Sequence, residues 1–134
     1  MTKQEFIINT LLPYFLEPST CGYTPDGCKY LTPDGRMCAA GKNMIDPSNW
    51  NSDTAITRIL SGNPIEGVFT PEAASMNLTP EQWQRIQYVH DEWARYSMGN
   101  DTGYTIQHIR DRINQCEQEC EINLLPLLEI VNAI

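Results

Sequence analysis

Three of the five cysteines lie within residues 21–41, a segment in which the tetrapeptide TPDG occurs twice. In each TPDG, proline favours the first central position of a turn, and glycine adopts the left-handed conformation that closes it. The chain is therefore expected to fold back on itself twice, and we name residues 21–41 the knuckle. With the second TPDG (32–35) as the tip of a hairpin, Cys28 and Cys38 would face each other across its two arms.

Two thiols held together in this way could form half of a zinc site, which needs four ligands. His90 or Cys21 could supply a further ligand, and the candidate metal-binding residues are Cys28, Cys38 and His90. The spacing between the two knuckle cysteines differs from that of standard zinc ribbons. A packed or oxidised cysteine pair is therefore favoured; no cofactor is expected, and zinc is the alternative.

Cys38 and His90 are also the candidate catalytic residues of a cysteine hydrolase. If the segment after Cys38 begins a helix, its N-terminus would lower the pKa of the thiol, with His90 as the base and Asp91 orienting it. Adjacent helical residues point about 100° apart, however, so Asp91 is expected not to reach the His90 ring easily. In the structural alternative, His90 donates to a knuckle carbonyl and the thiols pack against Trp83 and Trp93.

The knuckle carries a small group of positive charges in an acidic chain, whose net charge is −8. A binding surface is expected here, because binding residues usually lie on loops held by a rigid scaffold. It would contact a partner protein or a small anionic ligand. The alternative is that the knuckle only covers the core. The candidate binding residues are Lys29, Tyr30, Asp34, Arg36 and Lys42.

The overall acidity disfavours direct binding to nucleic acid or to an anionic membrane. Three glutamates between residues 117 and 121 form an acidic cluster, which could face a basic partner or simply be a solvated surface. Uninterrupted apolar runs span only a few residues, and the N-terminus lacks the basic start and apolar stretch of a signal peptide. The chain is therefore expected to be cytoplasmic.

Length and composition indicate one folded domain. With 134 residues, 41% of them hydrophobic, the chain can bury about two-thirds of its unfolded surface in one core. Capping residues and apolar periodicity predict a mainly α fold of five or six helices with one small β-hairpin. The helices are expected at residues 3–16, 53–61, 71–76, 80–98, 105–121 and 124–133.

Three of these helices have an apolar stripe that predicts their buried face. In the helix at 3–16 the apolar positions are Phe6, Ile7, Leu11, Phe15 and Leu16. In the helix at 80–98, an arc of about 80° contains Trp83, Ile86, His90, Trp93 and Ser97. In the helix at 105–121, a similar arc contains Ile106, Ile109, Ile113, Cys116 and Cys120. His90 is therefore expected inside, and the two cysteines of the last stripe are expected to be core thiols.

Several of these residues resemble, in their order and spacing, a group of small, largely uncharacterised phage-encoded proteins. The similarity covers roughly residues 2–93. The chain departs from the group at Leu31, where arginine is common, at Ala40, where valine is common, and in the extra first turn with Cys21. The residues that carry the resemblance are Cys28-x-Tyr30, Asp34-Gly35, Cys38-Ala39-Ala40-Gly41 and Gln87-x-x-His90-Asp91.

The resemblance implies a phage or prophage origin but no specific activity. Together with the acidity, it leads us to expect an accessory protein that binds and modulates or inhibits a host protein of defence, transcription or replication. A Walker loop, a dinucleotide fingerprint and an HExxH motif are all missing from the sequence, which favours a binding protein over an enzyme. The alternative is a ligand-sequestering protein or cysteine-dependent enzyme that uses a pocket of Cys28, Cys38 and His90.

Overall fold

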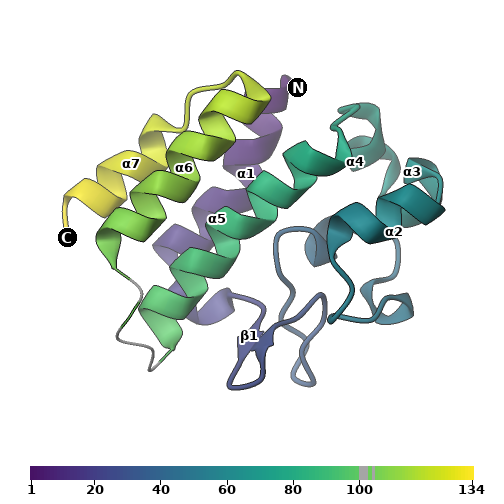
Figure 1. The fold of residues 1–134 in the computed structure, drawn as a ribbon, viewed down its shortest axis with the longest axis horizontal. Coiled ribbons are helices and arrows are strands. Elements are labelled where there is room, and N and C mark those ends of the chain that lie inside the picture. Colours follow the sequence, from purple (N-terminus) through teal and green to yellow (C-terminus); the bar gives the residue numbers. More distant parts are fainter. Residues whose placement is uncertain (100–102, 104) are drawn as a thin grey trace.

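Helices make up most of the computed structural model, which describes residues 1–99, 103 and 105–134 (Figure 1). In this part of the chain the α-helices are α1 (Lys3–Leu16), α2 (Ile56–Gly62), α3 (Ile65–Val68), α4 (Pro71–Ser75), α5 (Pro80–Met98), α6 (Ile106–Cys120) and α7 (Leu125–Asn132). Short 3-10 helices are η1 (Pro18–Thr20), η2 (Gly41–Asn43) and η3 (Pro47–Asn49). Strands β1 (Tyr23–Thr24) and β2 (Gly27–Cys28) form an antiparallel hairpin. The predicted fold, mainly α in a single domain with one small hairpin, is confirmed.

Capping side chains determine where the longer helices begin. At α1, Thr2 and Glu5 exchange hydrogen bonds with each other's backbone N–H, and Thr79 and Gln82 do the same at α5. These exchanges satisfy N–H groups that have no partner inside the helix. Helix α3 was not predicted from the sequence, since it is only one turn long and contains a glycine.

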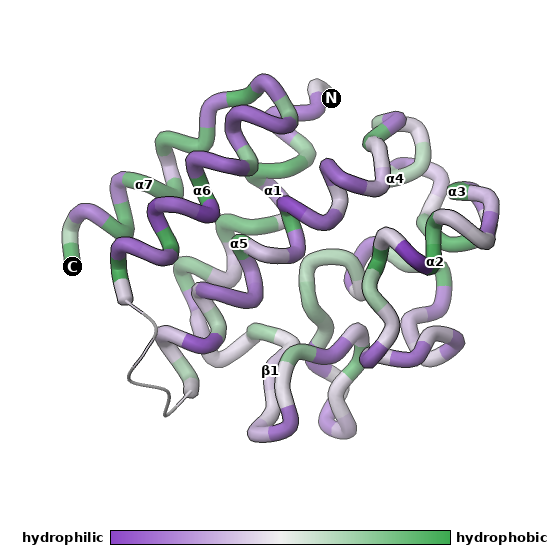
Figure 2. Tube along the Cα trace, viewed as in Figure 1, coloured by the Kyte–Doolittle hydropathy of each residue, from purple (hydrophilic) through white to green (hydrophobic). Residues whose placement is uncertain are grey.

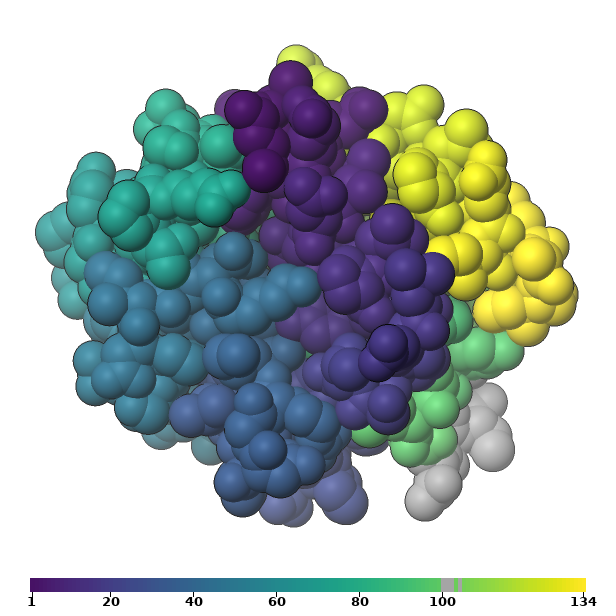
Figure 3. Space-filling model, turned by 180° about the vertical axis from the view of Figure 1, so that it is seen from behind, coloured from purple at the N-terminus to yellow at the C-terminus, as the bar shows by residue number. Residues whose placement is uncertain are grey.

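Helix α5 lies at the centre and packs against α6, α2 and α1, while α1 also packs against α7 (Figure 1). Hydrophilic and hydrophobic segments alternate along α5, α6 and α7, as expected for helices with one buried face (Figure 2). From behind, α1 crosses the surface between the C-terminal segment and the segment around residue 40 (Figure 3). None of the described helices has the length and apolar character needed to cross a membrane.

The predicted stripes of α5 and α6 are largely buried. Trp83 is fully buried and stacks on Phe69, with 4.0 Å between ring centroids. His90, Cys116 and Cys120 are also buried, which confirms their predicted positions. Ser97 is exposed, contrary to the stripe, because it lies near the helix end and donates a hydrogen bond to the Trp93 carbonyl. The intervening segment 99–103 was expected to end α5, but residues 100–102 lie outside the described part.

The knuckle differs from its predicted form, because the strand ladder forms around the first TPDG. Tyr23 pairs with Cys28, and the turn between them is closed by Gly27 at φ +114°. The second TPDG is closed by two bonds between Thr32 and Arg36: the Thr32 N–H donates to the Arg36 carbonyl, and the Thr32 hydroxyl accepts from the Arg36 N–H. The next bond between the two arms runs from the Cys38 N–H to the Lys29 carbonyl at 3.1 Å, so Cys38 lies opposite Lys29. These bonds do not form a strand ladder that pairs Cys28 with Cys38.

Candidate functional site

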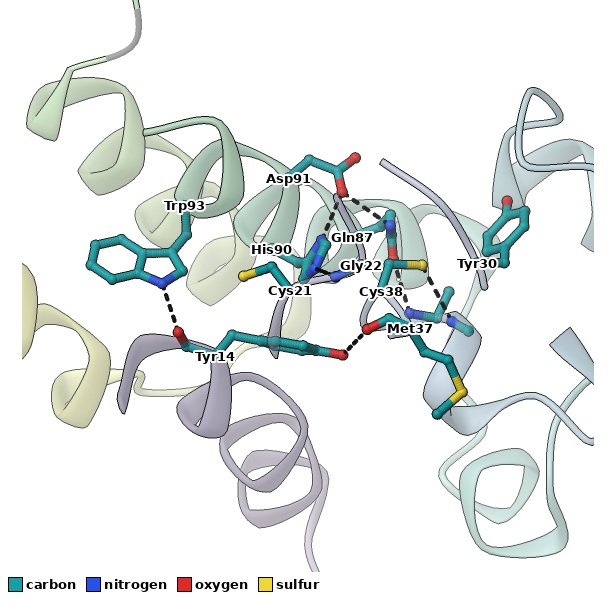
Figure 4. A network of polar contacts seen from close by, with 12 residues as sticks. Tyr14, Cys21, Gly22, Tyr30, Met37, Cys38, Gln87, His90, Asp91 and Trp93 are labelled. Atoms are coloured by element: carbon teal, nitrogen blue, oxygen red, sulfur yellow. Dashed lines mark hydrogen bonds and ion pairs between the residues drawn. The ribbon is translucent and has the colours of Figure 1, made fainter. Parts of the chain in front are cut away.

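The histidine and aspartate of α5 belong to a buried network that holds the knuckle (Figure 4). His90 Nε2 accepts a hydrogen bond from the Gly22 N–H at 3.1 Å, and His90 Nδ1 lies 2.9 Å from Asp91 Oδ1. A neutral imidazole has one N–H and one acceptor nitrogen. Because Nε2 accepts, the ring proton lies on Nδ1 and is donated to Asp91.

Two sequence expectations for this pair were wrong. Asp91 reaches the His90 ring, although the two residues are adjacent on α5, because rotation about the side-chain bonds covers the angle between their Cα–Cβ directions. His90 also does not donate to a knuckle carbonyl. Instead, it accepts a hydrogen bond from a knuckle N–H, that of Gly22.

Gln87 extends the network by one helical turn. Its Oε1 accepts from the Ala40 N–H at 2.9 Å, and its Nε2 donates to Asp91 Oδ1 at 3.0 Å. The Cys28 sulfur also lies near Asp91, with the two ligand atoms within 4.8 Å of each other. The Gln87-x-x-His90-Asp91 pattern therefore fixes two backbone N–H groups of the knuckle, one at each end of the segment.

Two glycines allow the knuckle backbone to fold tightly on itself. A Cβ atom at Gly22 would overlap the Cys38 nitrogen, and one at Gly41 would overlap the Tyr30 carbonyl. Only glycine fits such close backbone approaches. The motif residues of the knuckle and of α5 thus act together to hold one backbone arrangement.

This arrangement does not suit a cysteine nucleophile. Burial raises the pKa of the Cys38 thiol to about 12, even though the Gly41 N–H donates to its sulfur. At pH 7 only about one such thiol in 10⁵ is ionised. The helix expected to lower this pKa is the three-residue η2, which begins at Gly41 and is too short to offset burial. His90, the candidate base, cannot accept a proton from the thiol either, because its free lone pair already accepts the hydrogen bond from the Gly22 N–H.

The residues that could hold a metal differ from the predicted set. Among the described residues, ligand atoms of Cys28, His90 and Asp91 lie within 4.8 Å of one another, with Asp91 in place of Cys38. A metal on Nδ1 would require the proton on Nε2, where it would face the Gly22 N–H. Burial and the nearby negative charge of Asp91 also raise the pKa of Cys28, which favours the protonated thiol. The network as it stands therefore fits hydrogen bonds better than a metal ion.

Three of the predicted binding residues connect parts of the knuckle and its surroundings. The buried Tyr30 donates its hydroxyl to the Thr54 carbonyl at 2.6 Å, which anchors the loop before α2. Asp34 and Arg36 form an ion pair at 3.0 Å. Arg36 Nη1 also donates to the carbonyls of Cys21 (2.9 Å) and Tyr23 (2.8 Å), so this guanidinium joins the two turns.

The two predicted binding lysines lie at different sites. Lys29 lines a cavity of about 220 Å³ that also includes Cys28, Cys38 and Asp91. Lys42 instead lines a larger groove of about 560 Å³ between the end of α1, η1 and residues 35–42. The structure thus separates Lys29 from Lys42.

The groove was not predicted as a unit. Tyr14 lies along it with its hydroxyl donating to the Met37 carbonyl at 2.6 Å, and Lys42 Nζ lies 4.4 Å from the centre of the Tyr14 ring. Leu16, expected in the apolar stripe of the first helix, is 65% exposed at its edge. Leu16 is the last residue of α1, and this terminal position is the sequence signal that it lies at the surface.

Comparisons of the chain with protein families, curated proteins and solved structures find no match. Function must therefore be inferred from the arrangement of the described residues.

Proposed function

We propose that this chain is a binding protein, which contacts another protein through the knuckle and the surface next to it. The observation that carries this proposal is the use of Gln87, His90 and Asp91 to fix the knuckle backbone. Their polar atoms serve backbone N–H groups and one another, and the two buried knuckle thiols have raised pKa values because of burial. Such an arrangement positions loops for binding better than it supports nucleophilic chemistry.

The two turns of the knuckle are suited to this role. Their tips, at Pro25-Asp26 and Pro33-Asp34, are exposed, while Cys21 and Cys38 nearby are buried. Arg36 joins the turns through two carbonyls. Proline restricts the backbone of each turn, and glycine allows the positive φ that closes it. Loops that are already ordered lose less conformational entropy on binding, which favours affinity.

The resemblance of residues 2–93 to phage-encoded proteins supports a host-cell protein as the partner. In this proposal the chain acts as a phage accessory protein in the host cytoplasm, where it modulates or inhibits a component of defence, transcription or replication. The net charge of −8 favours a protein partner over nucleic acid.

Affinity capture with matched variants tests the proposal. The immobilised full chain is exposed to host lysate, and captured proteins are quantified for wild type, Asp26→Arg at an exposed turn tip, and Glu129→Arg on the exposed surface of α7. We expect a stoichiometric protein that binds wild type and Glu129→Arg equally. Asp26→Arg should bind it at least about tenfold more weakly, or 1.4 kcal/mol, with an unchanged melting temperature.

Failure to capture a stoichiometric protein would contradict the proposal. Equal binding by all three proteins would contradict the assignment of the interface to the knuckle.

A further inference from the structure

Lys42 is a half-buried cation without an ionic partner. Among the described residues, no carboxylate lies within ion-pair distance of its ammonium group. The Tyr14 ring, 4.4 Å from Nζ, offers only the weaker attraction of an aromatic face. A partly buried charge is most stable when an opposite charge accepts its hydrogen bonds. An anion that binds in the groove would complete this environment.

The surroundings of Lys42 are held in place before any ligand arrives. Its backbone N–H donates to the Cys38 carbonyl at 3.0 Å, within the segment that Gln87 anchors to α5. Tyr14 is fixed at both ends, because its hydroxyl donates to Met37 and its carbonyl accepts from the Trp93 indole at 2.8 Å. Such preorganisation lowers the entropic cost of binding.

The charges along the groove favour an anion at the Lys42 end. Arg36 lines the same groove, but its guanidinium is already paired with Asp34 at 3.0 Å, so Lys42 is the cation with which an incoming carboxylate can pair. Glu17 is the one carboxylate among the lining residues, and it forms no ion pair with Lys42. It directly follows the last residue of α1.

The rest of the groove is apolar and open to solvent. Leu16 is 65% exposed, Pro13 is exposed beside it, and Met37 is half-buried. Both segments that flank the groove, α1 and the residues around 40, border each other on the face shown in Figure 3. A volume of about 560 Å³ is within the range of sites that bind drug-sized ligands, which are comparable in size to a short peptide segment.

We propose that this groove binds a peptide segment of a partner protein in which a carboxylate side chain lies next to an apolar side chain. The carboxylate pairs with the Lys42 ammonium, and the apolar side chain lies against Leu16 and Pro13. This inference rests on the proposed binding function and names the chemistry of the partner segment.

Lys42 gives the interaction a characteristic pH dependence. Burial lowers the pKa of Lys42 to about 8, so the free protein loses this charge as the pH rises from 7 to 9.5. Burial raises the pKa of Tyr14, and it raises the pKa of Cys21 to about 12. Both neighbours of Lys42 therefore stay neutral over the same pH range. The other charged groups facing the groove are Arg36 and Glu17. Affinity for a carboxylate should therefore fall with rising pH.

Selection from a displayed library of random heptapeptides tests the inference. The full chain is immobilised at pH 7, and the most enriched peptide is synthesised with blocked ends and titrated against wild type, Lys42→Gln, Lys42→Arg and Lys29→Gln. Lys29→Gln is the matched control, because Lys29 is a half-buried knuckle lysine that lines the other cavity.

We expect enriched peptides to contain aspartate or glutamate next to an apolar residue. Lys42→Gln should weaken binding at least tenfold, whereas Lys29→Gln and Lys42→Arg should change it less than threefold. Between pH 7 and 9.5 the wild type should lose at least about sevenfold in affinity, if the neutral form binds tenfold more weakly, and at most about thirtyfold, which is the fall in the protonated fraction of a group of pKa about 8. Lys42→Arg should lose little.

Enrichment of peptides without a carboxylate, or of none at all, would overturn the inference. So would equal binding by wild type and Lys42→Gln. If the host partner is still captured through the knuckle in these cases, the proposed function stands and only the groove assignment fails.

Discussion

Replacing His90 with alanine tests the buried network most directly. The change leaves the Gly22 N–H, now 3.1 Å from Nε2, without an acceptor in the interior, at a cost of about 1–3 kcal/mol. It also removes a fully buried ring whose centroid lies 4.6 Å from that of Tyr14, which adds about 2 kcal/mol for the cavity. The free energy of unfolding should therefore fall by about 3–5 kcal/mol.

Urea unfolding measured by tryptophan fluorescence reports this loss, since the indole of Trp93 donates to the carbonyl of Tyr14 beside the network. His90→Gln is the informative companion, because its amide oxygen can accept from Gly22 and should recover about 1 kcal/mol. His108→Gln is the matched control: His108 is exposed at the third position of α6, where glutamine can also cap. It should change stability by less than about 0.5 kcal/mol.

The reasoning would be refuted by a His90→Ala protein that loses less than about 1 kcal/mol. It would equally fail if His90→Gln and His90→Ala were destabilised to the same extent, since the hydrogen bond to Gly22 would then contribute nothing measurable.

Two further predictions concern the knuckle. Gly41→Ala should destabilise the protein by at least about 3 kcal/mol in urea titrations, because the new Cβ would overlap the Tyr30 carbonyl. Gly62→Ala, with open space around it at the end of α2, should stabilise the protein by about 0.5–1 kcal/mol. Equal effects of the two changes would contradict the close approach at Gly41. Iodoacetamide at pH 8 should alkylate Cys21 and Cys38 more than about a hundredfold more slowly in the folded protein than in urea, because burial raises both pKa values to about 12 and only the thiolate reacts. Mass spectrometry of the digested protein measures this ratio, and fast alkylation of either cysteine in the folded state would show that its thiol is not buried.

The helices were predictable because their signals are local. The threonine at each N-cap and its partner three residues later act within one turn, and the structure shows both capping boxes, at Thr2 and at Thr79. The expected helix at 53–61 begins later, at Ile56, because the Asp53 N–H bonds to the side chain of Asn51 and keeps that stretch in a turn. Local signals were therefore reliable where no competing side-chain bond was available.

The site was less predictable, because its contacts join distant parts of the chain. The position of His90 inside followed from periodicity, but its partner, the Gly22 N–H, did not, since backbone donors have no sequence signature. The pKa of Cys38 was expected to fall and instead rises, because burial outweighs the donor from Gly41. Lys29 and Lys42 are close in sequence, yet in the folded chain Lys29 lines the smaller cavity and Lys42 lines the groove beside α1.

The separation in sequence between the knuckle and α5 has a consequence for synthesis of the protein. The donor to His90 lies 68 residues before it, and the carbonyl that binds the Trp93 indole lies 79 residues before that indole. While the ribosome makes the first half of the chain, α5 is not yet present, so the apolar residues of α1 and the knuckle that pack on α5 remain exposed. The N-terminal half must wait for α5 to emerge, so a nascent chain stalled before residue 80 would be a substrate for chaperones and proteases.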